Sequence, residues 1–286
     1  MTLAFIVCAS ALNVNRWMTE EANLKQVARY GNAVITIGLN SDSQTRFLRT
    51  EDVYETLSDN VVAAGGYDLP IYTDDGAFFS TVAVDFTEIT QIFDFQFIEY
   101  GEVKGNSVDD TAFVTQAFAE KNSLGIGDSF SCNLLGNEKT YTVQGITARA
   151  FMDRYEVMVS VSGVMRLLAR SSPVLAVLGD GIQLYSSLYI APKTASEGGH
   201  VQEWIAALRA EEMFADKTIT NTEDSIRQTQ SDSQVFVITI YMSIGLVIFL
   251  SAAVVFCCFY ILSQQRANEN ALFHALGVKS SSLLFL

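Results

Sequence analysis

The chain has 286 residues, of which 49% are hydrophobic and 17% are charged, and its 18 basic and 32 acidic residues give a net charge of −14. This excess of acidic residues disfavours nucleic acid and anionic headgroups, so we expect no nucleic-acid partner. Of the four cysteines, Cys8, Cys257 and Cys258 fall in apolar runs, which excludes a disulfide-rich fold.

The N-terminal segment 1–14 is apolar from Leu3 to Val14. As a helix this run covers roughly 18 Å, too short to cross a bilayer. A signal peptide with a cleavage site at Ala9-Ser10-Ala11 is one interpretation. We favour the other, a partial first transmembrane helix whose beginning is missing. The end of the chain, 281–286, turns apolar again and predicts the start of a truncated third transmembrane helix.

Residues 15–234 predict an extracytoplasmic domain in which helices and strands alternate irregularly. We therefore expect an α+β fold with a mixed sheet, in two subdomains, between two transmembrane helices. Phe93, Phe95 and Phe97 alternate as on one face of a strand, where core packing is favoured over a substrate groove. The expected helices are 15–29, 51–57 capped by Thr50, 110–121, 163–170, 195–210 and 222–234 capped by Thr222; the expected strands are 33–39, short pieces in 61–99, a hairpin of 130–135 and 139–146, 155–161, 174–178, 184–191 and 217–221.

Residues 235–262 contain no charged residue and predict the second transmembrane helix with an outer extension. Tyr241 and Tyr260 are separated by roughly 28 Å of helix, as two rings at opposite headgroup levels would be. A short polar turn is expected next, within a cytoplasmic segment 263–280. Arg266 and Lys279 place that end in the cytoplasm by the positive-inside tendency.

Groups for catalysis are scarce in this sequence. The histidines are His200, in the outer domain, and His274, on the cytoplasmic side, so we expect no catalytic residues and no metal site. The acidic pairs Asp74-Asp75 and Asp109-Asp110 lack a calcium-loop spacing and are interpreted as solvated turns. No Walker motif is present, so the chain is expected to be no enzyme and to bind no cofactor, and any ATP is hydrolysed by another chain.

Two segments resemble one known family. After the second span come Arg266, Glu269, Leu272, Ala275, Leu276 and Gly277, with the spacing found at that place in FtsX-like and MacB-type ABC transporter permeases. In the outer domain, residues 112–146 contain an apolar helix, Leu-Gly-Ile-Gly-Asp-Ser-Phe and a hairpin ending Tyr-Thr-Val-Gln-Gly-Ile, similar to the MacB-like extracytoplasmic domain.

The resemblance implies a permease subunit in a bacterial plasma membrane, multi-pass in its full length. Its partners would be a cytoplasmic ABC ATPase, which binds the ATP, a second permease copy or half, and the lipid bilayer. It also implies that Arg266, Glu269, Leu272, Leu276 and Gly277 couple the chain to the ATPase. The alternative is a bitopic membrane sensor whose outer domain binds a ligand. The sequence identifies no substrate.

Overall fold

The computed structural model describes residues 16–17, 20–43, 47–72, 78–101, 107–134, 136–171, 183–194 and 199–276. The chain divides into two compact units, Trp17–Thr229 and Met1–Arg16 with Gln230–Leu286. The expected first and third transmembrane segments, 1–14 and 281–286, lie outside the described residues, as does the strand expected at 174–178.

The unit Trp17–Thr229 is built on one mixed sheet of ten strands, in the order β10-β1-β9-β2-β3-β8-β5-β7-β4, with β6 paired to β2 and β7. The pairs β3–β8 and β5–β7 are parallel, and the others are antiparallel. This confirms the α+β fold, with all the described strands joined in a single sheet. The strands are β1 (Ile35–Gly38), β2 (Val61–Tyr72), β3 (Phe78–Val84), β4 (Phe97–Tyr100), β5 (Thr111–Thr115), β6 (Ser129–Leu134), β7 (Asn137–Thr147), β8 (Val157–Ser160), β9 (Ser187–Pro192) and β10 (Thr218–Asn221).

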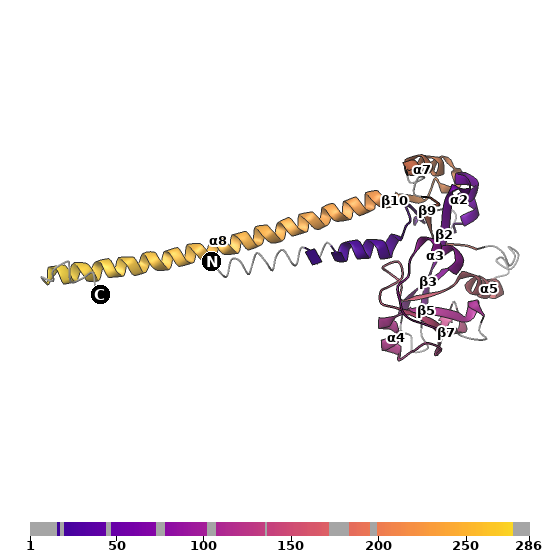
Figure 1. Ribbon diagram of the computed structural model, residues 1–286, viewed down its shortest axis with the longest axis horizontal. Coiled ribbons are helices and arrows are strands. Elements are labelled where there is room, and N and C mark those ends of the chain that lie inside the picture. Colours follow the sequence, from indigo (N-terminus) through magenta and orange to yellow (C-terminus); the bar gives the residue numbers. More distant parts are fainter. Residues whose placement is uncertain are drawn as a thin grey trace. The chain divides into compact units, whose positions relative to one another are not determined.

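Helices cover both faces of this sheet. Residues 20–30 are helical, as the sequence predicts for the start of the domain. Within this unit α2 lies beside α7, near β2 and β9, whereas α4 lies near β5 and β7 (Figure 1). The remaining helices of the unit are α2 (Thr50–Leu57), α3 (Phe86–Ile92), α4 (Gln116–Asn122), α5 (Val161–Ser171) and α7 (Val201–Ala210), with short 3-10 turns at Ser58–Asn60, Val108–Asp110 and Glu212–Phe214.

The central strands contribute side chains to a separate hydrophobic cluster on each face. Along β3, Ala83 belongs to the larger cluster and its neighbours Val82 and Val84 to the smaller one. The same alternation separates Ala112 and Val114 from Phe113 in β5. Successive side chains of a strand point to opposite faces, so these strands are buried on both sides.

Burial on both faces explains an error in the sequence prediction. The expected helix 110–121 is instead strand β5 followed by the shorter helix α4. All five residues of β5 are buried, so the segment lacks the polar alternation that marks a half-exposed strand.

The expected strand through Phe93, Phe95 and Phe97 is wrong for the first two residues, whereas Phe97 begins β4. Helix α3 precedes it, and 93–96 is irregular. Asp85 caps α3 by accepting hydrogen bonds from the backbone N–H of Thr87 (2.8 Å) and Glu88 (3.3 Å), a signal that the sequence contained. The interpretation as core is confirmed for Phe93, which is buried and stacks on Phe95 at 5.8 Å.

Two expected helix caps are corrected. Thr50 is the first residue of α2, and the preceding Arg49 makes no side-chain cap. Thr222 is likewise the first residue of α8, and its hydroxyl is buried without a hydrogen-bond partner. The cap of α8 is Asn221, whose side-chain oxygen accepts from the N–H of Glu223 at 2.9 Å.

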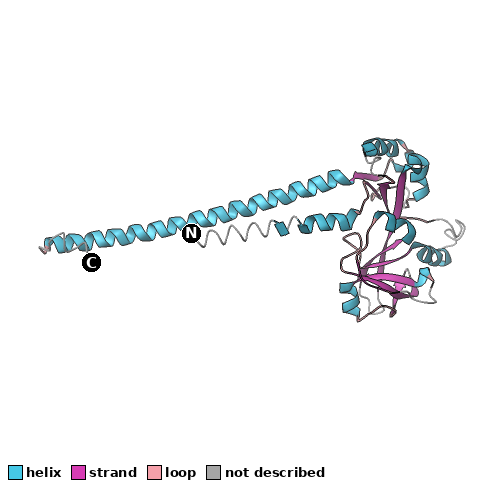
Figure 2. Cartoon of the chain, in the orientation of Figure 1, coloured by secondary structure: helices cyan, strands magenta, loops and turns pink. Residues whose placement is uncertain are grey.

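Helix α8 (Thr222–Ala275) is a single helix of 54 residues (Figure 2). The segment 235–262 lies within it, and so do the polar residues 263–270. The polar turn expected after the span is therefore absent, and the helix ends at a turn at Leu276 instead.

One substitution tests the tight packing of the core. A Cβ added at Gly65 would lie 2.0 Å from the ring of Tyr185, which is fully buried, whereas one at Gly38 meets no atom within 4 Å. We expect Gly65→Ala to destabilise the protein by about 1–3 kcal/mol, because a buried ring has little room to move. Thermal unfolding followed by near-ultraviolet circular dichroism measures this, with Gly38→Ala as the control that does not lower the midpoint. Equal midpoints for Gly65→Ala and the parent would contradict the packing.

A second substitution tests a buried carboxyl. Burial, followed by the nearby carboxylates of Asp85 and Glu51, raises the pKa of Glu88 to about 7, and its Oε2 atom is buried without a hydrogen-bond partner. Because the pKa is raised in the folded state, Glu88 favours folding at low pH and loses that contribution as pH rises through about 7.

We therefore expect Glu88→Gln to match the parent near pH 5 and to exceed it by about 1 kcal/mol near pH 8, after allowance for solvent screening of a half-buried group. Unfolding at the two pH values measures the difference, with the exposed Glu138→Gln as the control. A difference independent of pH would contradict the assignment.

Candidate functional site

The residues that the sequence assigns to ATPase coupling lie at the end of α8. Arg266, Glu269 and Leu272 are within the helix, Leu276 is at the turn that closes it, and Gly277 lies outside the described residues. The backbone N–H of Leu276 donates to the carbonyl of Leu272 at 3.1 Å, so these two residues are one helical turn apart. Their side chains are 64% and 72% exposed, so both are accessible to a partner.

The middle of α8 is long and apolar enough to cross a membrane. The most apolar 18 residues of the stretch Val237–Asn268 have a mean hydropathy of 2.7, and none of them is buried. Its hydroxyl groups are satisfied within the helix: Thr239 donates to the carbonyl of Val235, Ser243 to that of Thr239 and Ser251 to that of Val247, at 2.8–2.9 Å. Internal satisfaction of polar groups is what a hydrocarbon environment requires.

The outer domain contains a pocket of about 600 Å³ on one face of β10, β1 and β9. In one row across these strands Thr220 pairs with Thr36 and Thr36 with Tyr189. In the next row Gly38 lies between Thr218 and Ser187. The alternate residues, Ile35, Ile37, Leu188, Ile190 and Ile219, point to the opposite face and belong to the larger hydrophobic cluster. The two-residue period thus gives these strands an apolar face and a face rich in hydroxyl groups.

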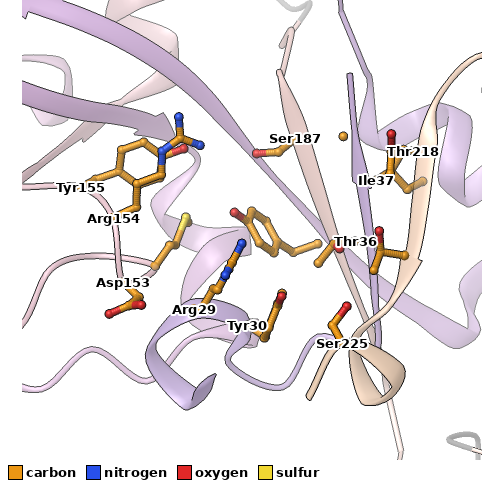
Figure 3. Close-up of a pocket in the computed structure, with 14 residues that line it drawn as sticks. Arg29, Tyr30, Thr36, Ile37, Asp153, Arg154, Tyr155, Ser187, Thr218 and Ser225 are labelled. Carbon is orange, nitrogen blue, oxygen red and sulfur yellow. The ribbon is translucent and has the colours of Figure 1, made fainter. Parts of the chain in front are cut away.

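The walls of the pocket come from three other segments (Figure 3). Arg29 and Tyr30 end the helix of residues 20–30, Ser225 belongs to the first turn of α8, and residues 152–155 form a hairpin turn. The helix is joined to α8 by a hydrogen bond from Gln26 Nε2 to the carbonyl of Ile226 at 3.5 Å. All these residues belong to the unit Trp17–Thr229.

Two guanidinium groups reach this pocket. That of Arg29 lies 5.3 Å from the centre of the Tyr30 ring and has no carboxylate partner among the described residues. That of Arg154 lies 5.2 Å from the ring of Tyr155 and 3.4 Å from Asp68 Oδ2. The Tyr155 hydroxyl also donates to Asp68, and burial followed by this hydrogen bond raises the pKa of Tyr155. Asp68 is thus engaged by groups of the pocket wall.

The hairpin turn that carries Arg154 has an unusual backbone. Met152 and Asp153 both have positive φ angles, 52° and 56°, and the N–H of Arg154 donates to the carbonyl of Phe151 at 3.0 Å. Positive φ at both central positions defines a type I′ turn, which favours Asn and Gly. Burial of Met152 in the smaller hydrophobic cluster holds this conformation.

The sequence analysis did not identify this pocket. Its residues come from six segments of the chain and carry no recognisable motif. The only local signal was the run of hydroxyl residues alternating with isoleucine in β1 and β10.

Among the described residues no group of three or more His, Cys, Asp or Glu side chains is placed to hold a metal ion. His200 contacts Glu203 at 2.8 Å, at the start of α7. Asp109 differs from the solvated turn that the sequence predicted: it is buried, accepts hydrogen bonds from Ser160 and Ser162 and pairs with Arg166, which fixes the start of α5. Asp74 and Asp75 lie outside the described residues.

The chain thus combines a mixed α+β domain with an exposed apolar helix long enough to cross a bilayer. That is the composition of a membrane protein with a folded domain outside the bilayer.

No protein-family model and no curated protein sequence matches the chain. Among solved structures, it is similar to the periplasmic region of MacB from Actinobacillus actinomycetemcomitans, with 11% identity and a TM-score of 0.46 over 72% of this chain and 95% of the other. It is also similar to the extracellular domain of the noncanonical ABC-type transporter YknZ from Gram-positive bacteria, with 13% identity and a TM-score of 0.42 over 66% of this chain and all of the other. These likenesses are partial and concern the course of the backbone.

The type I′ turn generates a test of backbone strain. Replacing Asp153 by glycine removes the penalty for a side chain at φ 56°. We expect Asp153→Gly to raise the free energy of unfolding by about 0.5–1 kcal/mol, as the relief of one left-handed residue predicts. Denaturant unfolding measures the change. The comparison is Asp128→Gly, at a position without positive φ, which should destabilise the protein because it also removes the hydrogen bond that Asp128 Oδ2 accepts from the N–H of Gly125 at 2.8 Å. A destabilised Asp153→Gly protein would contradict the strain.

Proposed function

We propose that this chain is a permease subunit of a bacterial ABC transporter of the FtsX/MacB type. The observation that supports this most is the composition of α8. It begins directly after β10 of the outer sheet, contains the apolar stretch Val237–Asn268, and ends in residues 266–276 with the spacing of that family's coupling segment.

In this proposal the outer domain is extracytoplasmic, the end of α8 is cytoplasmic and the protein lies in the plasma membrane. ATP is bound and hydrolysed by a separate cytoplasmic ATPase, and a second permease copy or half completes the transporter. The chain contributes no catalytic group. Its work is to connect the ATPase to the outer domain, for export, for extraction or for transmission of force.

The proposed contact with the ATPase uses the exposed side chains at the end of α8. Leu272 and Leu276 are four residues apart and therefore lie on the same side of the helix. A pair of exposed leucines on one side of a helix is suited to an apolar groove on a soluble partner. Because α8 is continuous from residue 222, movement of this end is passed on along hydrogen-bonded backbone.

A substitution at Leu272 tests the coupling. In the full-length protein, a photoreactive amino acid at position 272 is expected to crosslink in cells to a chain with a Walker motif, identified by mass spectrometry. In reconstituted nanodiscs, Leu272→Asp is expected to lower the stimulated rate of ATP hydrolysis roughly tenfold, as removal of a central interface anchor does.

The matched control is Ala267→Asp, which adds the same charge at an exposed position on the opposite side of the same helix and should leave the rate unchanged. An unchanged rate of ATP hydrolysis in Leu272→Asp, or the lack of any crosslink from position 272 to a chain with a Walker motif, would overturn the coupling role. Crosslinking only to a signalling protein without a Walker motif would support the alternative of a bitopic sensor.

A further inference from the structure

We propose that the pocket on β10, β1 and β9 binds a small soluble polyol that carries a phosphate or carboxylate group. This ligand site is separate from the transport function proposed above, since it uses no residue of the apolar stretch of α8 or of its coupling end. It rests on four features of the pocket: an arginine without a carboxylate partner, a floor of hydroxyl groups, an open glycine and a nearly balanced set of other charges.

Arg29 provides the anion-binding group. No carboxylate of the described residues pairs with it, although residues 15–234 contain 31 acidic and 16 basic side chains. Its guanidinium instead lies against the Tyr30 ring, 5.3 Å from the ring centre, which leaves its N–H donors available toward the pocket. A guanidinium of this kind donates paired hydrogen bonds to a phosphate or carboxylate.

The hydroxyl floor provides the contacts for a polyol. The hydroxyls of Thr36, Thr220 and Ser225 have no hydrogen-bond partner within the described parts of the chain. Thr36 and Thr220 are direct neighbours across β1 and β10. Each hydroxyl can donate one hydrogen bond and accept others, which matches the hydroxyl groups of a sugar or another polyol.

Gly38 keeps the floor open. An added Cβ there meets nothing within 4 Å, and the flanking residues in the same row are Thr218 and Ser187. The pocket volume of about 600 Å³ lies within the usual range for small-molecule sites, roughly 300–1,000 Å³. A side chain at position 38 would therefore occupy ligand space without disturbing the core.

The remaining charges nearly cancel. Arg154 is paired with Asp68, whose other oxygen accepts from the Tyr155 hydroxyl, and Asp153 contributes one negative charge to the lining. These groups sum to −1, and Arg29 brings the pocket to neutrality, so the preference for an anion rests on the unpaired guanidinium of Arg29 and not on net charge. Removal of the Asp153 charge should strengthen binding of an anion and weaken binding of a cation.

The proposal is tested by titrating the whole chain in phosphatidylcholine nanodiscs with three anionic polyols, glucose 6-phosphate, glycerol 3-phosphate and gluconate, and with neutral glucose and glycerol. We expect saturable one-site binding for at least one of the anions, no binding for the neutral counterparts and weaker binding for inorganic phosphate alone. Arg29→Gln should weaken the binding roughly tenfold or more, because a hydrogen bond to a charged group is lost.

The control with the same loss of charge is Arg209→Gln, at an exposed arginine of α7 that does not line the pocket, and it should leave the affinity unchanged. Gly38→Val should abolish binding while keeping the unfolding midpoint of the parent. Asp153→Asn, which tolerates positive φ, should strengthen binding about twofold to threefold. The proposal is overturned if none of the three anions binds, if Arg29→Gln and Arg209→Gln weaken binding equally, or if Gly38→Val binds as the parent does.

A second arm separates a soluble ligand from a lipid headgroup, which has the same chemistry. The titration is repeated in nanodiscs that contain phosphatidylglycerol. An unchanged affinity for the soluble anion supports the proposal. If phosphatidylglycerol lowers the affinity of the parent for the soluble anion but does not lower that of Arg29→Gln, the pocket binds a lipid headgroup. This result would overturn the assignment to a soluble ligand.

Discussion

Burial of the central strands on both faces is the constraint on which the outer domain depends. Strands β3, β5 and β8 carry apolar side chains toward two separate clusters, so each face needs its own cover. Helices α2, α4, α5 and α7 contribute to one side, and α3 and the turn at residues 151–155 to the other. Where this double cover ends, at β10, β1 and β9, one face remains open and is lined by hydroxyl groups. The pocket exists because the layer formed by α3 and the turn at residues 151–155 does not extend over β10, β1 and β9.

The sequence predicted those parts of the fold that have a visible period or a turn signal. The hairpin of β6 and β7 and strand β1 are confirmed because Gly136 and alternating residues mark them. Strand β5 was predicted as helix because burial on both faces removes the alternation. Helix α3 was missed because it has only seven residues, too few for a helical period to stand out.

The two candidate sites differ in how far the sequence could identify them. The coupling segment of α8 is contiguous, so a resemblance over twelve residues was enough to propose it, and its assignment stays a prediction. The pocket is formed by strands and loops that are distant in the chain. Arg29 and Thr220, for example, are brought together only by the pairing of β1 with β10 and by the turn that leads from the first helix into β1. No local pattern encodes that proximity.

Strand β10 has a double role whose consequence is thermodynamic. Thr218 and Thr220 form part of the pocket floor, and Asn221 caps α8, whose first residue donates its N–H to the carbonyl of Val34 at 3.0 Å. A ligand that favours one arrangement of β10 therefore changes the free energy of any displacement at the start of α8. By linkage, the same displacement must change the ligand's affinity by the same factor. Ligand binding in the pocket and displacement of the start of α8 are then coupled, so a measurement of either one reports on the other.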